Sequence, residues 1–191
     1  PYSVELAPIG GAIDTGAMQE AIRHVIRRHE ILRTTLIVDP NSGRVVPHIA
    51  DPDAAEKLFL WEERTTQAKD TSKLLSEAAA EPFDLAHGPL VRALLLSQAD
   101  GSQTKHWLQI NLHHAAVDGW SIKILKRELA ITYACLTSSG VLPSEAELPG
   151  PAFQYADYAA WQHACEASPA GETARMAGLT YWCENLRHAP V

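Results

Sequence analysis

The chain has 191 residues, 46% of them hydrophobic, and a formal net charge of -7 at pH 7. This length and hydrophobic content predict one soluble globular unit with a core of its own. The acidic balance and the lack of a basic run argue against a nucleic-acid partner. No stretch reaches the roughly 20 apolar residues that a membrane-spanning helix needs, so no membrane partner is expected.

The number and position of the cysteines indicate in which cellular compartment the protein is located. Cys135, Cys165 and Cys183 are odd in number and lie in segments with helical patterns. Reduced structural thiols of this kind are typical of cytoplasmic proteins. No secretory signal precedes the first expected strand, and we therefore predict a cytoplasmic location. The sequence opens on Pro1 rather than Met, which we interpret as a piece of a longer protein.

Apolar residues recur with helical and strand periods in turn, which predicts strands interspersed with helices. Strands are expected over 2–6, at the end of 28–36, and over 44–49, 58–61, 90–96 and 106–112. Helices are expected from Asp14 or Thr15 onward and over 66–79, 121–133, 153–162 and 173–186. Hairpin-length turns at 41–43 and 100–101 favour antiparallel pairing. The predicted fold class is α/β (α+β), with a mixed, largely antiparallel sheet and helices packed on it.

The first expected helix has two different sides. Its buried stripe consists of Met18, Ile22, Val25, Ile26 and His29. Its exposed side carries Arg23, Arg27 and Arg28. Further along, residues 137–151 are rich in Ser, Gly, Pro and Glu and are expected to form a linker-like loop. The aromatic residues of the last two helices are expected to pack in a core or between lobes rather than to bind a ligand.

Two histidines at the end of the strand 106–112 are the strongest candidates for chemistry. Neighbouring strand residues point to opposite faces, so His113 and His114 would have different surroundings. They are therefore poor joint metal ligands, no Cys-x-x-Cys or His-x-x-x-His accompanies them, and no metal site is expected. A single neutral imidazole at a strand end suits proton transfer, because its unperturbed pKa lies near working pH.

Asp118 follows the histidines across a short turn that Gly119 would allow to fold sharply. Its carboxylate could orient His114, or it could pair with an arginine and hold the turn in shape. The second interpretation is preferred, because the chain supplies candidate arginines elsewhere. Ser121 is expected to cap the helix that follows, whose apolar residues fall three and four apart.

Several segments together resemble a known family. Residues 113–119 read His-His-Ala-Ala-Val-Asp-Gly, and residues 28–34 read Arg-His-Glu-Ile-Leu-Arg-Thr. Residues 155–162 read Tyr-Ala-Asp-Tyr-Ala-Ala-Trp-Gln, residues 181–182 read Tyr-Trp, and residues 82–90 run from Pro-Phe-Asp-Leu to Gly-Pro-Leu. In this order and over nearly the whole chain, they resemble motifs of the condensation domains of non-ribosomal peptide synthetases, within the chloramphenicol-acetyltransferase-like superfamily.

The resemblance implies an enzyme of the acyltransferase type that forms peptide bonds. Its substrates would be aminoacyl or peptidyl thioesters held by donor and acceptor peptidyl carrier proteins. These partners would present the substrates on 4′-phosphopantetheine arms, and no cofactor would bind the chain directly. Adenylation and carrier modules would be neighbours in the same assembly.

The resemblance also assigns the catalytic role to His114. The imidazole would either take a proton from the attacking amine or hold that amine and stabilise the tetrahedral intermediate by hydrogen bonding. Both roles use a neutral ring, so the choice between them stays open. His113 would pack inward and support the strand end.

Four further residues are expected to support the site: Asp118, Gly119, Arg28 and Arg33. Asp118 would pair with one of the two arginines, Arg28 rather than Arg33, and so fix the loop. Gly119 would keep the passage beside His114 open to the phosphopantetheine arm, because a side chain there would intrude.

Against the family pattern, residues 1–191 correspond to the N-terminal lobe of the domain, without the family's first motif and without the C-terminal lobe. The arms of the two carriers meet between the lobes in that family, so we expect the fragment alone not to catalyse at a useful rate. An excised lobe would expose the apolar face that meets its partner lobe, which favours self-association.

Two alternatives remain. One is another coenzyme A-dependent acyltransferase of the same superfamily, against which the Tyr-x-Asp-Tyr-Ala-x-Trp-Gln match argues. The other is a non-catalytic lobe that docks a carrier protein.

Overall fold

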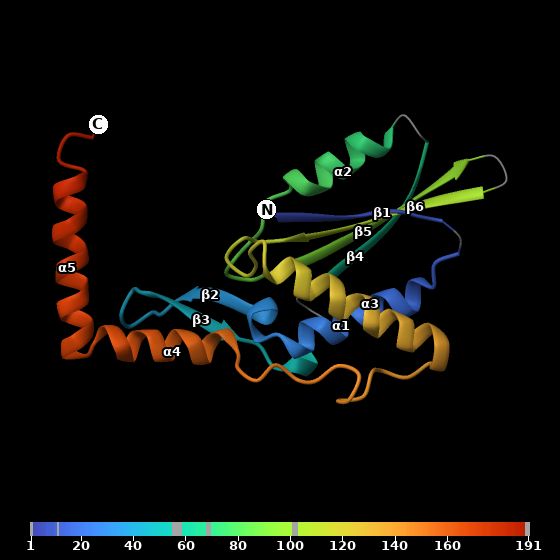
Figure 1. The fold of residues 1–191 in the computed structure, drawn as a ribbon. Helices are drawn as coiled ribbons and strands as arrows, with labels where there is room; N and C mark the ends of the chain where they lie inside the picture. Colours follow the sequence, from blue (N-terminus) through green and yellow to red (C-terminus); the bar gives the residue numbers. More distant parts are fainter. Residues whose placement is uncertain (1, 11, 55–58, 68–69, 101–102, 190–191) are drawn as a thin grey trace. The chain divides into compact units, whose positions relative to one another are not determined.

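The computed structural model describes residues 2–10, 12–54, 59–67, 70–100 and 103–189. The chain divides into two compact units, residues 1–151 and 152–191, and each is described by itself. Figure 1 shows the order of the elements along the chain. Among the helices of these ranges, none combines the length and the apolar character that crossing a bilayer requires.

A four-stranded sheet forms the centre of the first unit. Its strands are β1 (Tyr2–Gly10), β4 (Phe59–Thr66), β5 (Val91–Asp100) and β6 (Gln103–Leu112). They lie in the order β1-β6-β5-β4. Strand β6 runs antiparallel to β1 and to β5, whereas β4 runs parallel to β5. The prediction of a mixed, largely antiparallel sheet is therefore confirmed.

Helices cover both faces of this sheet, as Figure 1 shows. Helices α1 (Thr15–Arg28) and α3 (Ser121–Ser139) lie on one face and contact each other. Helix α2 (Thr71–Ala80) lies on the other face. The expected arrangement of helices packed on a mixed sheet is confirmed.

Strand β5 shows how the sequence produces these two layers. Val91 and Leu95 point into the larger hydrophobic core, which contains residues of α1 and α3. Leu94 and Leu96 point the other way and pack with Leu75 of α2. Alternate residues of a strand face opposite sides, and both sides are covered here, so β5 is a nearly continuous apolar run.

Helix α1 follows its sequence pattern closely. The carboxylate of Asp14 accepts a hydrogen bond from the Ala17 amide at 2.9 Å and caps the helix, as predicted. The predicted stripe is buried at Met18, Ile22, Val25 and Ile26. His29 lies just past the last residue of the helix and is half-buried.

Several predicted boundaries differ from the structure, and two of them have a clear physical cause. The helix expected over 66–79 begins at Thr71, because all of 59–66 pairs in register with β5. The loop expected over 137–151 begins later, since α3 runs on to Ser139 and ends at Gly140 with φ of 71°. Of the remaining expectations, Leu58 and Gly101 lie outside the described residues.

Strands β2 (Thr34–Val38) and β3 (Val45–Ile49) form a separate antiparallel ribbon. The turn between them contains Gly43, whose φ of 67° lies in the left-handed region that favours glycine. The Asp39 carboxylate accepts hydrogen bonds from the Asn41 amide and the Ser42 hydroxyl. The hairpin turn predicted at 41–43 is confirmed.

The second unit consists of α4 (Tyr155–Glu166) and α5 (Pro169–Asn185). Neither described helix contains a buried residue. Its aromatic rings contact one another along the helices: Tyr155 with Tyr158, Tyr158 with Trp161, and Tyr181 with Trp182. The expected core around these rings is absent from the described residues, while packing between lobes stays a prediction.

The sheet allows a matched test of where stability resides. Val91 is 1% exposed in β5, whereas Val45 is 64% exposed in the β2–β3 ribbon. We expect Val91→Ala to lower the free energy of unfolding by about 2 kcal/mol, through lost burial and a residual cavity. The same change at Val45 should cost less than about 1 kcal/mol, the range of strand propensity. Denaturant titration of both variants measures the difference, and equal losses would contradict the assigned core.

Candidate active site

The site is built on the end of strand β6. Asn111 and Leu112, the last residues of this strand, are fully buried, and Leu112 pairs with Tyr2 of β1 and Val91 of β5. The strand stops there, so the two histidines lie in the loop that follows it. We had expected them to continue the strand. A central strand held on both sides gives this loop a fixed starting point.

His113 packs against the protein. Its ring meets Phe83 edge-on, with centroids 5.9 Å apart and planes at 78°. Its Nδ1 accepts a hydrogen bond from the Ala115 amide at 3.0 Å, which places the proton of the neutral ring on Nε2. Leu85 and Leu90 line a small cavity with it. His113 is therefore packed against the protein, and its supporting role in the site stays a prediction.

His114 has the opposite environment. The Ala116 amide donates a hydrogen bond to the His113 carbonyl at 2.9 Å and closes a turn over 113–116. His114 is the second residue of that turn and is exposed. A turn, rather than the alternation of a strand, thus separates the two rings and leaves His114 exposed.

Asp118 caps helix α3. Its Oδ1 accepts hydrogen bonds from the Ser121 hydroxyl at 2.6 Å, the Ser121 amide at 2.7 Å and the Trp120 amide at 3.1 Å. The Ser121 hydroxyl is the main reason why the pKa of this carboxyl lies below its ordinary value, and the two amides add to the effect. Ser121 therefore donates to the cap instead of providing it, which corrects our expectation for Ser121.

The expected pairing of Asp118 with Arg28 or Arg33 is wrong. Among the described residues, the hydrogen-bond partners of the Asp118 carboxylate are the cap donors of α3. A carboxylate three residues before Ser121 can reach the amides at the start of the helix, which have no partner within the helix.

Arg28 instead binds a buried carboxylate of α3. Its Nε donates to Glu128 Oε2 at 3.1 Å, and the two side chains are 10% and 9% exposed. His29 Nε2 lies 2.8 Å from the same oxygen. Burial opposes the charge of Glu128, but the hydrogen bonds from His29 and Arg28 outweigh it and hold its pKa below the ordinary value. Arg28 was expected on the exposed side of its helix, and the structure corrects this.

Arg28 also fixes the segment after α3. Its two terminal nitrogens donate to the carbonyl oxygens of Leu148, at 3.3 Å, and Pro149, at 2.6 Å. Leu148 is buried, and the Gly150 amide donates to the Glu145 carboxylate. The stretch that we expected to be linker-like is therefore held against α1 by specific contacts.

Arg33 acts elsewhere. It lies in the 3-10 turn η1 (Glu30–Arg33), is buried, forms an ion pair with Glu30 at 3.5 Å and donates to the Ala50 carbonyl. These contacts join the turn to the end of β3. Among the described residues, the partners of Arg33 are thus Glu30 and Ala50 rather than Asp118.

Gly119 lies in an exposed turn before α3. The described glycines with positive φ are Gly43, Gly88 and Gly140, so the conformation at Gly119 does not itself require glycine. Its expected role in leaving a passage open stays a prediction.

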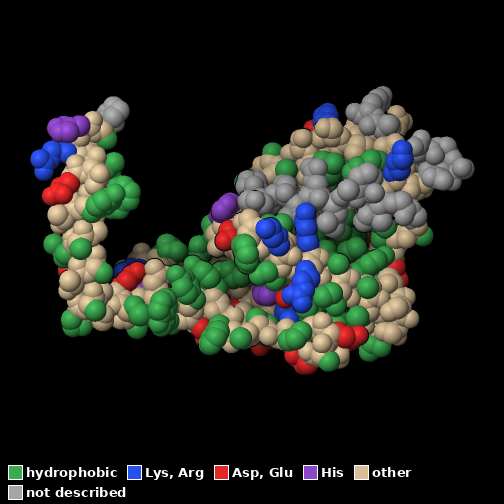
Figure 2. Space-filling view, in the orientation of Figure 1, with side chains coloured by type: hydrophobic (Ala, Val, Ile, Leu, Met, Phe, Trp, Pro, Cys, Tyr) green, Lys and Arg blue, Asp and Glu red, His purple; other side chains and the backbone are tan. Residues whose placement is uncertain are grey.

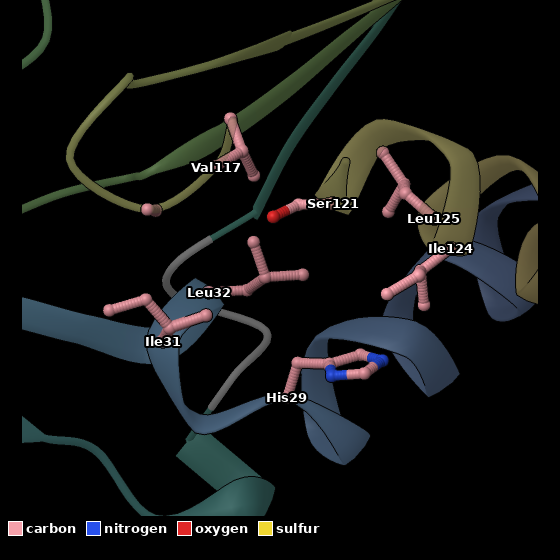
Figure 3. A pocket seen from close by; sticks show the side chains of 8 residues that line it. His29, Ile31, Leu32, Val117, Ser121, Ile124 and Leu125 are labelled. Carbon is pink, nitrogen blue, oxygen red and sulfur yellow. The ribbon is translucent and has the colours of Figure 1, made fainter. Parts of the chain in front are cut away.

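An apolar pocket of about 110 Å³ lies beside this loop (Figure 3). It is lined by His29, Ile31, Leu32, Ala116, Val117, Ser121, Ile124 and Leu125. In Figure 3, His29 and Leu32 approach it from the α1 side and Leu125 from α3. Val117 and Ala116 follow His114 by three and two residues, so the loop contributes to the pocket wall.

Three partners in this site were not predicted as such: Glu128, Phe83 and Ser121. Glu128 carries a readable signal, because it falls on the apolar stripe of α3 between Leu125 and Leu129. A charged residue on a buried stripe requires a partner, which here is Arg28. The contact between Phe83 and His113 depends on tertiary structure and leaves no such local signal.

The chain is similar in sequence to proteins of a known family. The sequence model named "Condensation domain" matches residues 5–191. The chain belongs to the condensation-domain family. It is 37% identical over 182 residues to chondramide synthase cmdD of Chondromyces crocatus, covering 93% of this chain and 4% of that protein. It is 36% identical over 187 residues to phosphinothricin tripeptide synthetase PhsC of Streptomyces viridochromogenes, covering 95% of this chain and 16% of that one.

Solved structures show the same fold. The X-domain in complex with OxyB from teicoplanin biosynthesis matches with a TM-score of 0.78 and 27% identity, over 99% of this chain and 38% of that one. The epimerization domain TycB3(E) of tyrocidine synthetase B matches with a TM-score of 0.74 and 21% identity, over 100% of this chain and 40% of that one. This condensation-domain chain thus spans well under half of the chains that it resembles.

The buried ion pair yields a stability prediction. Arg28→Ala leaves Glu128 buried without its guanidinium partner and should lower the free energy of unfolding by about 3 kcal/mol. Arg23→Ala on the same helix removes a half-exposed partner of Glu20 and should cost less than about 1 kcal/mol. Chemical denaturation measures both, and hydrogen exchange at residues 141–150 should rise only in Arg28→Ala. Equal losses of stability would contradict the buried pair.

Glu128 also yields a prediction on pH. Its pKa is lower in the folded chain than in the unfolded one, so its charge stabilises the fold fully above the unfolded pKa of about 4.3. That contribution is lost as the pH falls through the folded pKa. Glu128→Gln should therefore destabilise the protein at neutral pH and converge on wild-type stability in acid. A gap in unfolding free energy that stays constant from pH 7 to pH 3 would oppose this account.

Proposed function

We propose that the condensation domain containing this chain forms amide bonds between carrier-bound aminoacyl or peptidyl thioesters. The observation that carries the proposal is the division between the two rings: His113 packs on Phe83, while His114 is exposed at the tip of a turn anchored by a buried strand. Family membership and the peptide synthetases among the relatives support the reaction class.

In the proposed reaction, the amine nitrogen of the acceptor attacks the thioester carbonyl carbon of the donor. A C–N bond forms, the carbonyl oxygen becomes an oxyanion, and its collapse breaks the C–S bond and releases the donor thiol. The amine loses one proton and the departing thiolate gains one. His114 either carries that proton or hydrogen-bonds the amine and the tetrahedral intermediate, and the exposed ring suits both roles.

The substrates and partners belong to the same proposal. Donor and acceptor peptidyl carrier proteins would present their groups on 4′-phosphopantetheine, with adenylation and carrier modules in the same cytoplasmic assembly. Residues 1–191 would be the N-terminal lobe, and the part of the domain beyond it would supply the other wall of the reaction space. The coverage of 38% and 40% of two solved chains supports this division.

A non-catalytic docking lobe is the second candidate. The observation that favours it is the X-domain relative, whose solved structure is a complex with OxyB. Under this alternative, the exposed His114 would have no effect on amide formation, and the lobe would only bind a partner.

The test is amide formation by the complete condensation domain with carrier-bound substrates, followed by mass spectrometry. His114→Ala should lower the rate about 100- to 10,000-fold, the usual effect of losing a proton-transfer group. His87→Ala is the matched control, since His87 is also exposed but lies in the loop before β5. It should keep the wild-type rate.

His114→Gln separates the two roles of the ring. A glutamine amide can hydrogen-bond the amine but cannot take its proton at neutral pH. Substantial rescue relative to His114→Ala indicates positioning, and no rescue indicates a base. Wild-type turnover in His114→Ala would contradict the catalytic assignment and favour the docking alternative.

A further inference from the structure

The outward face of α3 carries three basic side chains. Lys123, Lys126 and Arg127 are exposed, while Ile122 and Leu125 of the same helix are buried. Within the described ranges, no carboxylate lies at ion-pair distance from any of the three basic residues. Figure 2 shows basic side chains gathered over the first turns of this helix.

These charges differ from the arginines of the neighbouring helix. On α1, Arg23 and Arg27 both contact Glu20, and Arg28 contacts Glu128. The helix dipole does not explain the α3 charges either, because cations are favoured near a helix C-terminus and Lys123 lies in the first turn. The fold gains no evident stability from this concentration of positive charge.

An aromatic side chain adjoins the basic residues. Trp120 is 71% exposed, and the Lys123 Nζ lies 5.2 Å from its ring centroid. Tryptophan and arginine are enriched among the residues that dominate protein–protein binding energy. We call Trp120, Lys123, Lys126 and Arg127 the α3 basic face.

The α3 basic face begins beside the loop that carries His114. Trp120 follows His114 by six residues, and Arg127 lies about 9 Å along the helix from Ser121 at the α-helical rise. The free amides at the helix start already bind Asp118, so an anionic partner would be held by these side chains instead. A partner that delivers a substrate to His114 must approach over a nearby surface.

Charge favours one kind of occupant. The chain as a whole carries a net charge of -7, which repels an acidic partner over most of its surface. A local positive face attracts such a partner and orients it during approach. A carrier protein bears the negatively charged phosphodiester of its phosphopantetheine arm next to the surface that must face the enzyme.

We propose that the α3 basic face docks a carrier protein through an acidic surface around its phosphopantetheine-bearing residue. This inference rests on the proposed function, because it assigns a docking place to the partner of that reaction. Lys126 and Arg127 contact the partner's carboxylates, and Trp120 packs against its apolar rim. The arm then enters the reaction space at the His114 loop.

The experiment compares two deliveries of the same acyl group to the complete condensation domain. One substrate is bound to its carrier protein, and the other is a free pantetheine thioester without protein or phosphate. The variant Lys126→Glu with Arg127→Glu should raise KM for the carrier-bound substrate about tenfold or more at low salt. Its kcat/KM for the pantetheine thioester should stay within about twofold of wild type, because no residue of the site is changed.

Three controls make the result specific. The variant Arg44→Glu with Lys73→Glu introduces the same charge change at exposed residues outside α3 and should leave both substrates unaffected. High salt should raise the wild-type KM for the carrier toward that of the variant. A phosphopantetheine thioester without protein should behave like the pantetheine thioester.

An unchanged KM for every carrier tested would overturn the docking proposal. Equal losses with carrier-bound and free substrates would also overturn it, because the charges would then act on the site itself. An equal loss with the phosphopantetheine thioester would show that the face binds only phosphate. Failure of the proposed function is distinct, since wild-type protein would then form no amide from either substrate.

Discussion

The arrangement of this chain depends on a short loop that is fixed at both ends. At one end, Leu112 is fully buried between β1 and β5 and stops the strand. At the other, the Asp118 carboxylate binds the first amides of α3 and the Ser121 hydroxyl. Only five residues lie between these two fixed ends, so the loop can adopt few conformations. One ring can therefore pack against the protein while its neighbour is exposed.

A second contact holds α3 in place behind the loop. The Arg28–Glu128 pair joins α1 to α3, and Arg28 also binds the carbonyls of Leu148 and Pro149. Buried ion pairs contribute little net stability compared with apolar packing, but they tolerate few alternative arrangements. The motif residue Arg28 thus supports the candidate site through the helix that Asp118 caps, and not through Asp118 itself.

The parts of the fold that could be predicted are those that local sequence determines. The Asp14 cap, the stripe from Met18 to Ile26 and the turn at Gly43 each depend on a few neighbouring residues. The late start of α2 could not be predicted, because pairing of 59–66 with a strand some thirty residues away decides it. The partner of Asp118 was wrongly predicted for a related reason: cap amides three residues away compete better than a distant arginine. Glu128, a carboxylate on the apolar stripe of α3, could have predicted a buried ion pair but was overlooked.

The two adjacent histidines have separate duties: His113 is packed, and His114 is proposed to react. The most direct measurement is site-resolved ethoxycarbonylation of the complete condensation domain, with peptide mass spectrometry and amide formation followed in parallel. We expect His114 to react well before His113, which Phe83 and the Ala115 amide protect, and activity to fall in step with His114 modification. Faster modification of His113, or full activity after complete modification of His114, would contradict this expectation.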